Sequence, residues 1–187
     1  MSVIQYSFKL PLVTAPSDHD VWIPIFHDWI RTKAIDDDVL VDVADYAHVQ
    51  GGPGVLLVCH EGQYVIDRSR GQVGLAYHRR RGVAPDDAVE GAAVGLRRLV
   101  RAAKLLATDA RVSGMEFDTT RLEVRVLDRL RVSNDEAGWG IVAEPLKQAI
   151  AAVWGGEVKL VRADVEARQP LTVHATMTAR AVADLTA

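Results

Sequence analysis

Hydrophobic and polar residues alternate at the start of the chain, and a period of two is typical of a strand that buries one face. Residues 2–12 are therefore predicted to form a half-buried strand, with a core face of Ile4, Tyr6, Phe8 and Leu10 and a polar face of Gln5, Ser7 and Lys9. A second strand is predicted at residues 39–45, with Val39, Val41 and Val43 aligned. Residues 54–60 are apolar on both faces, which is typical of a central strand.

Short turns divide the chain into further strands. Glu-Gly-Gln at 61–63 and Arg-Gly-Gln at 70–72 predict hairpin connections, so a meander of three antiparallel strands is expected from residue 54 to residue 80. Alternation predicts another strand within residues 115–131, and two final strands are predicted at 157–163 and 171–179.

A spacing of three and four between apolar residues predicts three helices. The longest is expected at residues 86–108, with an apolar stripe of Val89, Ala92, Ala93, Leu96, Leu99, Val100, Ala103 and Leu106. Shorter helices are predicted at 23–33 and 144–154, each with a proline in its first turn, where the missing N–H costs nothing. The segment Ser-Asn-Asp-Glu-Ala-Gly before the last helix is interpreted as a turn.

These elements indicate a single α+β domain over residues 1–187, with a mostly antiparallel sheet and helices packed on one face. Residues 2–60 and 121–178 share the order strand, helix, strand, strand. An internal duplication is therefore a hypothesis, in which residues 62–108 add a hairpin and the long helix to the first copy.

Composition excludes several classes of protein. With 187 residues, 49% hydrophobic and 25% charged, the chain has ordinary globular composition, and no apolar stretch is long enough to cross a bilayer. No signal peptide is visible, and the single cysteine, Cys59, excludes an internal disulfide and a cysteine zinc cage. We therefore expect a cytoplasmic protein, with Cys59 packed as a small hydrophobe and His60 on the opposite face of its strand.

Charge is segregated along the chain. Residues 1–67 carry three basic and ten acidic side chains, a balance of −7, whereas residues 68–104 carry nine basic and three acidic ones, a balance of +6. The two segments could neutralise each other within one molecule or across a dimer, or the basic segment could form an exposed surface that binds anions.

The basic segment supplies the candidate residues for an anionic ligand or partner: Arg79, Arg80, Arg81, Arg97, Arg98, Arg101 and Lys104. Arg97, Arg101 and Lys104 share one stripe of the long helix, which a solvated helix face would equally explain. Nucleic acid is an unlikely partner, since the pI is about 6.1 and no aromatic residues interleave with the arginines. The glycine-rich loop 45–54 runs from strand to strand and has no nucleotide-binding motif.

Histidine and carboxylate side chains supply a candidate metal site. Five of the six histidines fall between residues 19 and 78, but none has the spacing of a local metal motif. A divalent metal would need a long-range site made of Asp45, His48, His60 and Glu61, if the strands beside them pair so that these residues meet. The alternative is that all four are turn and strand-end residues.

No catalytic residue can be named from these patterns, because no candidate nucleophile has a base at a suitable spacing. The leading hypothesis is a non-catalytic interaction or assembly protein that self-associates through its acidic and basic segments. The alternatives are a small metal-dependent enzyme or metal-binding protein, and a protein that binds an anionic ligand. The identity of any cofactor is unknown at this point.

Overall fold

The computed structural model describes residues 4–80 and 87–187, which form one antiparallel sheet and three α-helices. The helices are α1 (Trp22–Thr32), α2 (Ala88–Ala107) and α3 (Glu136–Trp154). The strands are β1 (Tyr6–Thr14), β2 (Leu40–Asp45), β3 (Val55–Cys59), β4 (Gly62–Asp67), β5 (Gly74–Arg79), β6 (Glu116–Phe117), β7 (Arg121–Val126), β8 (Val158–Arg162) and β9 (Thr172–Met177). The predicted α+β class is confirmed.

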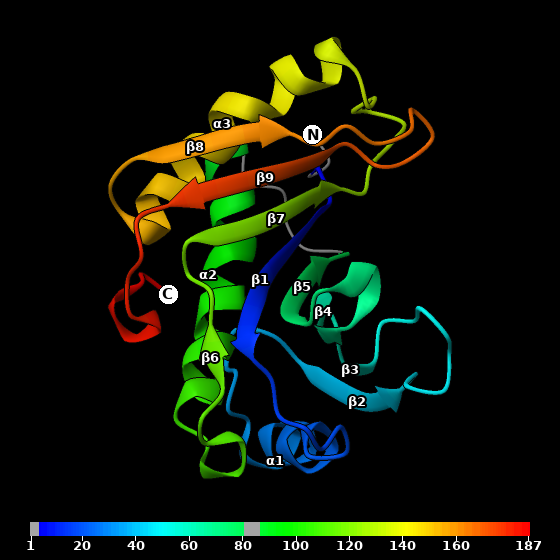
Figure 1. Ribbon diagram of the computed structural model, residues 1–187, viewed down its shortest axis with the longest axis vertical. Helices are drawn as coiled ribbons and strands as arrows, with labels where there is room; N and C mark the ends of the chain where they lie inside the picture. The colour runs from blue at the N-terminus through cyan, green and yellow to red at the C-terminus, as the bar shows by residue number, and fades with distance from the viewer. Residues whose placement is uncertain (1–3, 81–86) are drawn as a thin grey trace.

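The strands follow the order β2-β3-β4-β5-β1-β7-β9-β8, and the short β6 pairs with the end of β1 (Figure 1). The predicted meander is therefore present, and β1 lies in the middle of the sheet between β5 and β7. Strands β2 and β8 are the two edges of the sheet.

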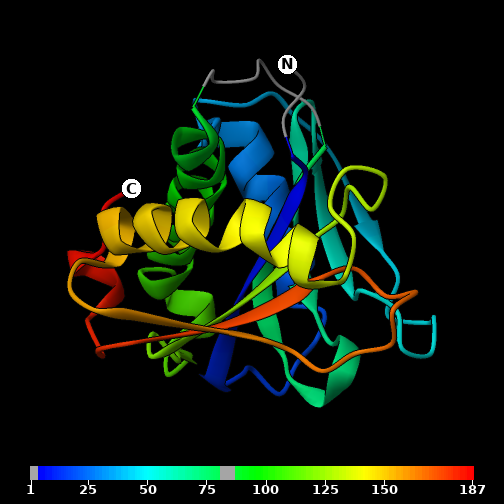
Figure 2. The same cartoon turned by 90° about the horizontal axis from the view of Figure 1, so that it is seen from above.

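All three helices pack on one face of the sheet, as predicted (Figures 1 and 2). Helix α2 lies across β1 and β5, and α3 packs against α2 and β8. The approach of α2 is close because Gly95 has no side chain: a Cβ there would lie 2.7 Å from Cε2 of Phe8. The inward residues Phe8, Tyr77 and Leu96 are almost fully buried in this layer.

The opposite, helix-free face of the sheet is also buried around β1, which corrects the prediction of a half-buried strand. Ser7 and Lys9 are each only 4% exposed. The short 3-10 turn Ser69–Gly71 lies close to this face, since the Lys9 ammonium donates to the Ser69 carbonyl oxygen at 3.1 Å. A polar side chain on a central strand is thus covered by a turn from a distant part of the chain.

A β-bulge changes which residues of β2 face the core. The register with β3 shifts between Leu40 and Asp42, so Leu40 and Val43 both pack against the main core. Val39 and Val41 are consequently 66% and 58% exposed. The predicted alignment of Val39, Val41 and Val43 is wrong, because a bulge inserts one residue and reverses the alternation.

Helix α3 begins eight residues earlier than predicted. Asp135 is its N-cap, and its side chain accepts a hydrogen bond from the backbone N–H of Gly138 at 2.9 Å. Pro145 therefore lies inside the helix rather than in its first turn, and the segment interpreted as a turn contains the N-terminal cap. The predicted helices at 23–33 and 86–108 correspond to α1 and α2; residue 86 lies outside the described residues.

The two proposed repeats occupy neighbouring parts of the sheet. β1 and β7, which would correspond, lie side by side and antiparallel, and the hairpin β4–β5 separates β1 from β3. The duplication itself stays a prediction. Among the described helices, none is long and apolar enough to cross a membrane.

Candidate functional site

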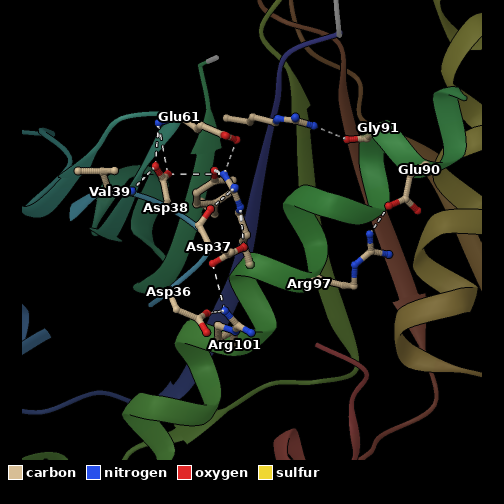
Figure 3. A network of polar contacts seen from close by, with 12 residues as sticks. Asp36, Asp37, Asp38, Val39, Glu61, Glu90, Gly91, Arg97 and Arg101 are labelled. Atoms are coloured by element: carbon tan, nitrogen blue, oxygen red, sulfur yellow. Dashed lines mark hydrogen bonds and ion pairs between the residues drawn. The ribbon is translucent and has the colours of Figure 1, made fainter. Parts of the chain in front are cut away.

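A buried arginine on α2 connects three segments of the chain on the helix side of the sheet. Arg98 is 6% exposed and reaches the acidic turn between α1 and β2. Figure 3 labels the three aspartates of this turn, Asp36, Asp37 and Asp38. The Arg98 Nε donates to the Asp37 carboxylate at 3.0 Å and its Nη2 to the Asp37 carbonyl at 2.8 Å. Its Nη1 donates to the Tyr77 hydroxyl at 2.7 Å and lies 2.9 Å from the Glu61 carboxylate. The guanidinium therefore joins α2, the turn before β2 and the β3–β4 turn.

Asp38 is the most enclosed carboxylate of this cluster. Its side chain is 1% exposed, and its Oδ1 accepts from the backbone N–H groups of Val39 at 2.8 Å and Glu61 at 3.1 Å. Burial raises the pKa of Asp38, although these two hydrogen bonds and Arg98 favour the charged form. The carboxylate thus depends on its hydrogen bonds and on the nearby guanidinium, 3.5 Å away.

The acidic and basic segments neutralise each other within the molecule. Arg101 contacts the carboxylates of Asp36 and Asp37, the latter at 3.2 Å, and Arg97 contacts Glu90 on its own helix (Figure 3). Of the alternatives left open by the sequence, the structure supports the intramolecular one for these arginines. The Arg98 cluster, which we define as Asp36, Asp37, Asp38, Glu61, Tyr77, Arg98 and Arg101, contains four carboxylates and two guanidinium groups.

The other residues predicted to bind an anion do not join these into one open surface. Arg79 is 5% exposed, and its Nη1 donates to the Gly91 carbonyl at 3.3 Å. Arg80 is exposed at the end of β5, and Lys104 lies half-buried near the end of α2. Arg81 lies outside the described residues.

The groups beside Arg98 are poorly suited to acid–base or nucleophilic chemistry. Burial raises the pKa of Cys59 to about 12, and the negative charge of Asp38 adds to this effect. The thiol contacts the Leu57 carbonyl at 3.7 Å, as expected of an inert buried cysteine. Burial also raises the pKa of Tyr77 to about 12, despite its hydrogen bond from Arg98. Neither the Cys59 thiol nor the Tyr77 hydroxyl is therefore ionised near neutral pH, and the contacts of Arg98 serve to hold separate segments of the fold together.

The residues predicted to bind a metal lie at opposite ends of the β2–β3 pair. Asp45 pairs with Val55 at one end, whereas His60 and Glu61 follow the other end of β3. Five strand residues at about 3.3 Å each separate the two ends by roughly 16 Å. Glu61 is already bound to Arg98, and the Asp45 carboxylate accepts from the Ala47 N–H at 2.8 Å.

His48, the fourth predicted ligand, stacks on Tyr46 in the exposed loop that follows β2. The four residues do not come together in this structure, because Asp45 and His48 lie at the loop end of the β2–β3 pair whereas His60 and Glu61 follow its other end. Within residues 4–80 and 87–187, no group of three or more His, Cys, Asp or Glu side chains is placed to hold a metal ion.

Glycines in the loop 45–54 allow backbone conformations and close approaches that other residues would not tolerate. Gly51 and Gly54 have positive φ angles of 69° and 84°. A Cβ on Gly54 would lie 2.4 Å from the Ile66 carbonyl oxygen, so the loop can cross β4 only with glycine at this position.

Two surface features that the sequence did not identify lie beside the edge strand β2 and in the connection from β7 to α3. Next to β2 is a hollow of about 360 Å³, lined by Ile30, Lys33, Ile35, Asp36, Asp38, Val39 and Leu40. Beyond β7, Leu130 is fully exposed between Arg129 and Arg131.

Sequence reasoning also missed a polar cluster on the helix-free face, around Lys9, Arg70, His78 and Arg125. Its members come from four distant segments of the chain, so no local motif could identify it. The only signal was the polar residue at every second position of β1 and β7.

Comparisons of the chain with protein-family models, with curated proteins and with solved structures found no match. Function must therefore be inferred from the geometry of the described residues.

Proposed function

We propose that this protein is a non-catalytic assembly protein that binds further copies of itself head to tail, with Leu130 of one copy in the hollow beside β2 of the next. The proposal depends chiefly on one observation: a fully exposed leucine flanked by two arginines, in a chain that also carries a largely apolar hollow with two aspartates and one lysine in its wall. An exposed apolar side chain that fits a pocket elsewhere on the same molecule can join copies head to tail.

The receiving surface combines apolar and acidic residues. Val39 and Val41 are exposed beside the hollow, and Ile30, Ile35 and Leu40 contribute apolar walls. The Arg98 cluster next to it has four carboxylates against two guanidinium groups, a surplus of two negative charges, which Lys33 in the wall of the hollow reduces to one. Asp42 and Asp45 add exposed carboxylates on the same edge strand. This surface would attract a basic partner.

The donating surface has the opposite charge. Arg129, Leu130 and Arg131 are all exposed in the connection from β7 to α3. This connection lies beside the loop after β8, because the Asn134 amide donates to the carbonyls of Val165 and Glu166 at 3.3 and 3.2 Å. Arg131 is 3.2 Å from Asp128, whereas Arg129 forms no ion pair with a described residue.

The β2 edge is better suited to receive a side chain of another copy than to pair with a strand of another copy. The bulge interrupts the ladder, and the Asp42 carboxylate accepts from the neighbouring Val43 N–H at 2.8 Å, which occupies a backbone donor. Both features protect edge strands from pairing with another strand. An interface between two β2 edges would also bring like charges together, so a heterologous contact is favoured.

Burial of Leu130 would contribute about 1.5–3 kcal/mol, or roughly a 10- to 150-fold change in the dissociation constant. The experiment is light scattering after size exclusion over a range of protein concentrations. The wild-type mass should rise with concentration and fall at high salt, because the contact includes opposite charges. Leu130→Asp and Val39→Asp should each remain monomeric, whereas the control Val13→Asp, at a similarly exposed valine on β1, should behave as wild type.

Mixing the two defective variants gives the sharpest test. Leu130→Asp retains an intact hollow and Val39→Asp retains an intact leucine, so an equimolar mixture should form a heterodimer that grows no further. A wild-type protein that stays monomeric at all concentrations, or a mixture that stays monomeric, would reject the proposal.

A further inference from the structure

The helix-free face of the sheet carries a charged cluster at its centre. We call it the outer-face cluster and define it as Ser7, Lys9, Asp67, Arg70, His78, Glu123 and Arg125. In the view of Figure 1, β1 and β7 pass in front of α2, so this face points toward the reader. Ser7 lies opposite His78 on β5 and opposite Arg125 on β7, and paired residues in a sheet share one face.

Four of the charged side chains of this cluster form ion pairs. The Lys9 ammonium lies 3.1 Å from the Asp67 carboxylate, and both side chains are less than one-tenth exposed. Arg70 lies 2.7 Å from Glu123 and 3.3 Å from Asp67. The carboxylates of Asp67 and Glu123 thus balance the charges of Lys9 and Arg70, and Arg125 adds one further positive charge.

Arg125 is the unmatched charge. Among the described residues it forms no hydrogen bond or ion pair, although it is half-buried. Burial and the neighbouring Arg70 lower its pKa, whereas Glu123 opposes this change. A half-buried guanidinium without a partner is costly, and a carboxylate ligand is its usual complement.

His78 is the second incomplete group. Its Nε2 is buried and has no hydrogen-bond partner within residues 4–80 and 87–187. Neighbouring strands lie about 4.8 Å apart, so the backbones of His78 and Arg125 are roughly 10 Å apart with β1 between them. Because the residue between them is the small Ser7, the imidazole and the guanidinium can approach each other above it. An arginine and an imidazole with unused hydrogen-bonding capacity therefore lie on either side of one small polar side chain.

We propose that Arg125, His78 and Ser7 form a binding site for the carboxylate group of a small ligand. The carboxylate accepts hydrogen bonds from the Arg125 guanidinium and from the His78 Nε2–H, with the Ser7 hydroxyl as a further donor. A carboxylate fits better than a phosphate monoester, because the cluster has one surplus positive charge and a phosphate monoester carries nearly two negative charges at pH 7.

Carboxylate binding should be coupled to protonation of His78. The charged groups that influence this imidazole are Arg125 on β7, Arg70 in the turn, Arg80 at the end of β5 and Asp67 on β4. The pKa of His78 is lowered to about 4, mainly by burial; the three arginines contribute to this decrease, whereas Asp67 opposes it. A bound carboxylate offsets the arginines, so it should raise the pKa of His78 and bind more tightly as the pH falls, as long as the carboxyl group of the ligand stays ionised.

The experiment is a pH titration of the His78 imidazole by NMR, with acetate as the probe and sodium chloride at equal ionic strength as the reference. Acetate should shift the His78 resonances saturably and raise its pKa, whereas chloride should not. Arg125→Gln should weaken acetate binding at least tenfold. Arg121→Gln is the matched control, because Arg121 lies on the same face of β7 but pairs with Asp118 at 2.6 Å.

His78→Gln provides a second variant and should abolish the pH dependence of acetate binding over the range in which acetate itself stays ionised, while the protein still melts cooperatively. Inorganic phosphate tests the charge argument and should bind more weakly than acetate at pH 7. The proposal is wrong if acetate and chloride have equal effects on His78, if Arg125→Gln binds acetate as wild type does, or if phosphate binds more tightly.

Discussion

Replacement of Arg98 by alanine should destabilise the protein by about 3–5 kcal/mol, the usual effect of removing one partner from a buried ion pair. The structure identifies which groups cause the loss. Without Arg98, the enclosed Asp38 carboxylate loses its closest cation and the buried Tyr77 hydroxyl loses a donor. Asp37 and Glu61 contribute less, because their side chains are 42% and 30% exposed and water can solvate them.

The loss should depend on pH. Since burial raises the pKa of Asp38, this carboxyl favours the folded state most when it is protonated, and its contribution falls as the pH rises through the folded-state pKa. Removing Arg98 raises that pKa further. The difference in stability between wild type and Arg98→Ala should therefore be largest at neutral pH and shrink in acid.

Urea denaturation at pH 7 and pH 4.5, followed by tryptophan fluorescence, measures both effects. Arg101→Ala is the control, because its partners Asp36 and Asp37 are exposed and such pairs contribute no more than about 1 kcal/mol. Asp38→Asn should recover part of the loss in the Arg98→Ala background. Equal losses for the two arginine variants, or a loss that does not change with pH, would refute the reasoning.

Three further predictions concern single positions. Gly62→Ala should cost about 1–3 kcal/mol by urea denaturation, because its Cβ would lie 2.7 Å from the Tyr77 hydroxyl that supports Arg98. Cys59 should react with a thiol reagent only at the rate of unfolding, since its thiol is buried and has a pKa of about 12; fast labelling of the native protein would contradict this. The pKa of His78 is about 4 in the folded protein and about 6.5 in the unfolded chain. The free energy of unfolding should therefore rise by roughly 1–3 kcal/mol as the pH increases between those two values. A flat pH profile, or the same slope in His78→Gln as in the wild type, would count against this prediction.

The sequence predicted elements whose signals are local. Helix α2 follows from its apolar spacing of three and four, and the β3–β5 meander follows from short polar turns. The start of α3 was missed because Pro145 was taken as the signal for the first turn. A proline inside a helix costs about 3 kcal/mol. Burial of Val142, Leu146 and Ile150 in the core can offset the cost of this proline, and no local sequence rule anticipates that burial.

The sites were less predictable than the elements because they depend on pairing between distant strands. Charge segregation correctly suggested that the acidic and basic segments could meet, but it did not show that Arg98 would be buried and Arg101 partly exposed. The outer-face cluster depends on the register that places Ser7 between His78 and Arg125. A shift of one residue would turn these side chains to the other face.

The two charged clusters have surpluses of opposite sign, and their surroundings decide what each can bind. In the Arg98 cluster the surplus is negative and its outermost carboxylate, Asp36, is 81% exposed, so water stabilises the charge and the surface repels small anions. In the outer-face cluster the surplus is positive and sits beside a buried imidazole nitrogen. Electrostatic attraction is stronger where water is excluded, so a small anion gains most at Arg125. The β2 edge instead suits a large basic surface, which can cover the exposed valines at the same time. The two proposals assign small-ligand binding to the centre of the sheet and assembly to the β2 edge and the connection from β7 to α3. The acetate titration and the mixing experiment test these two proposed roles separately.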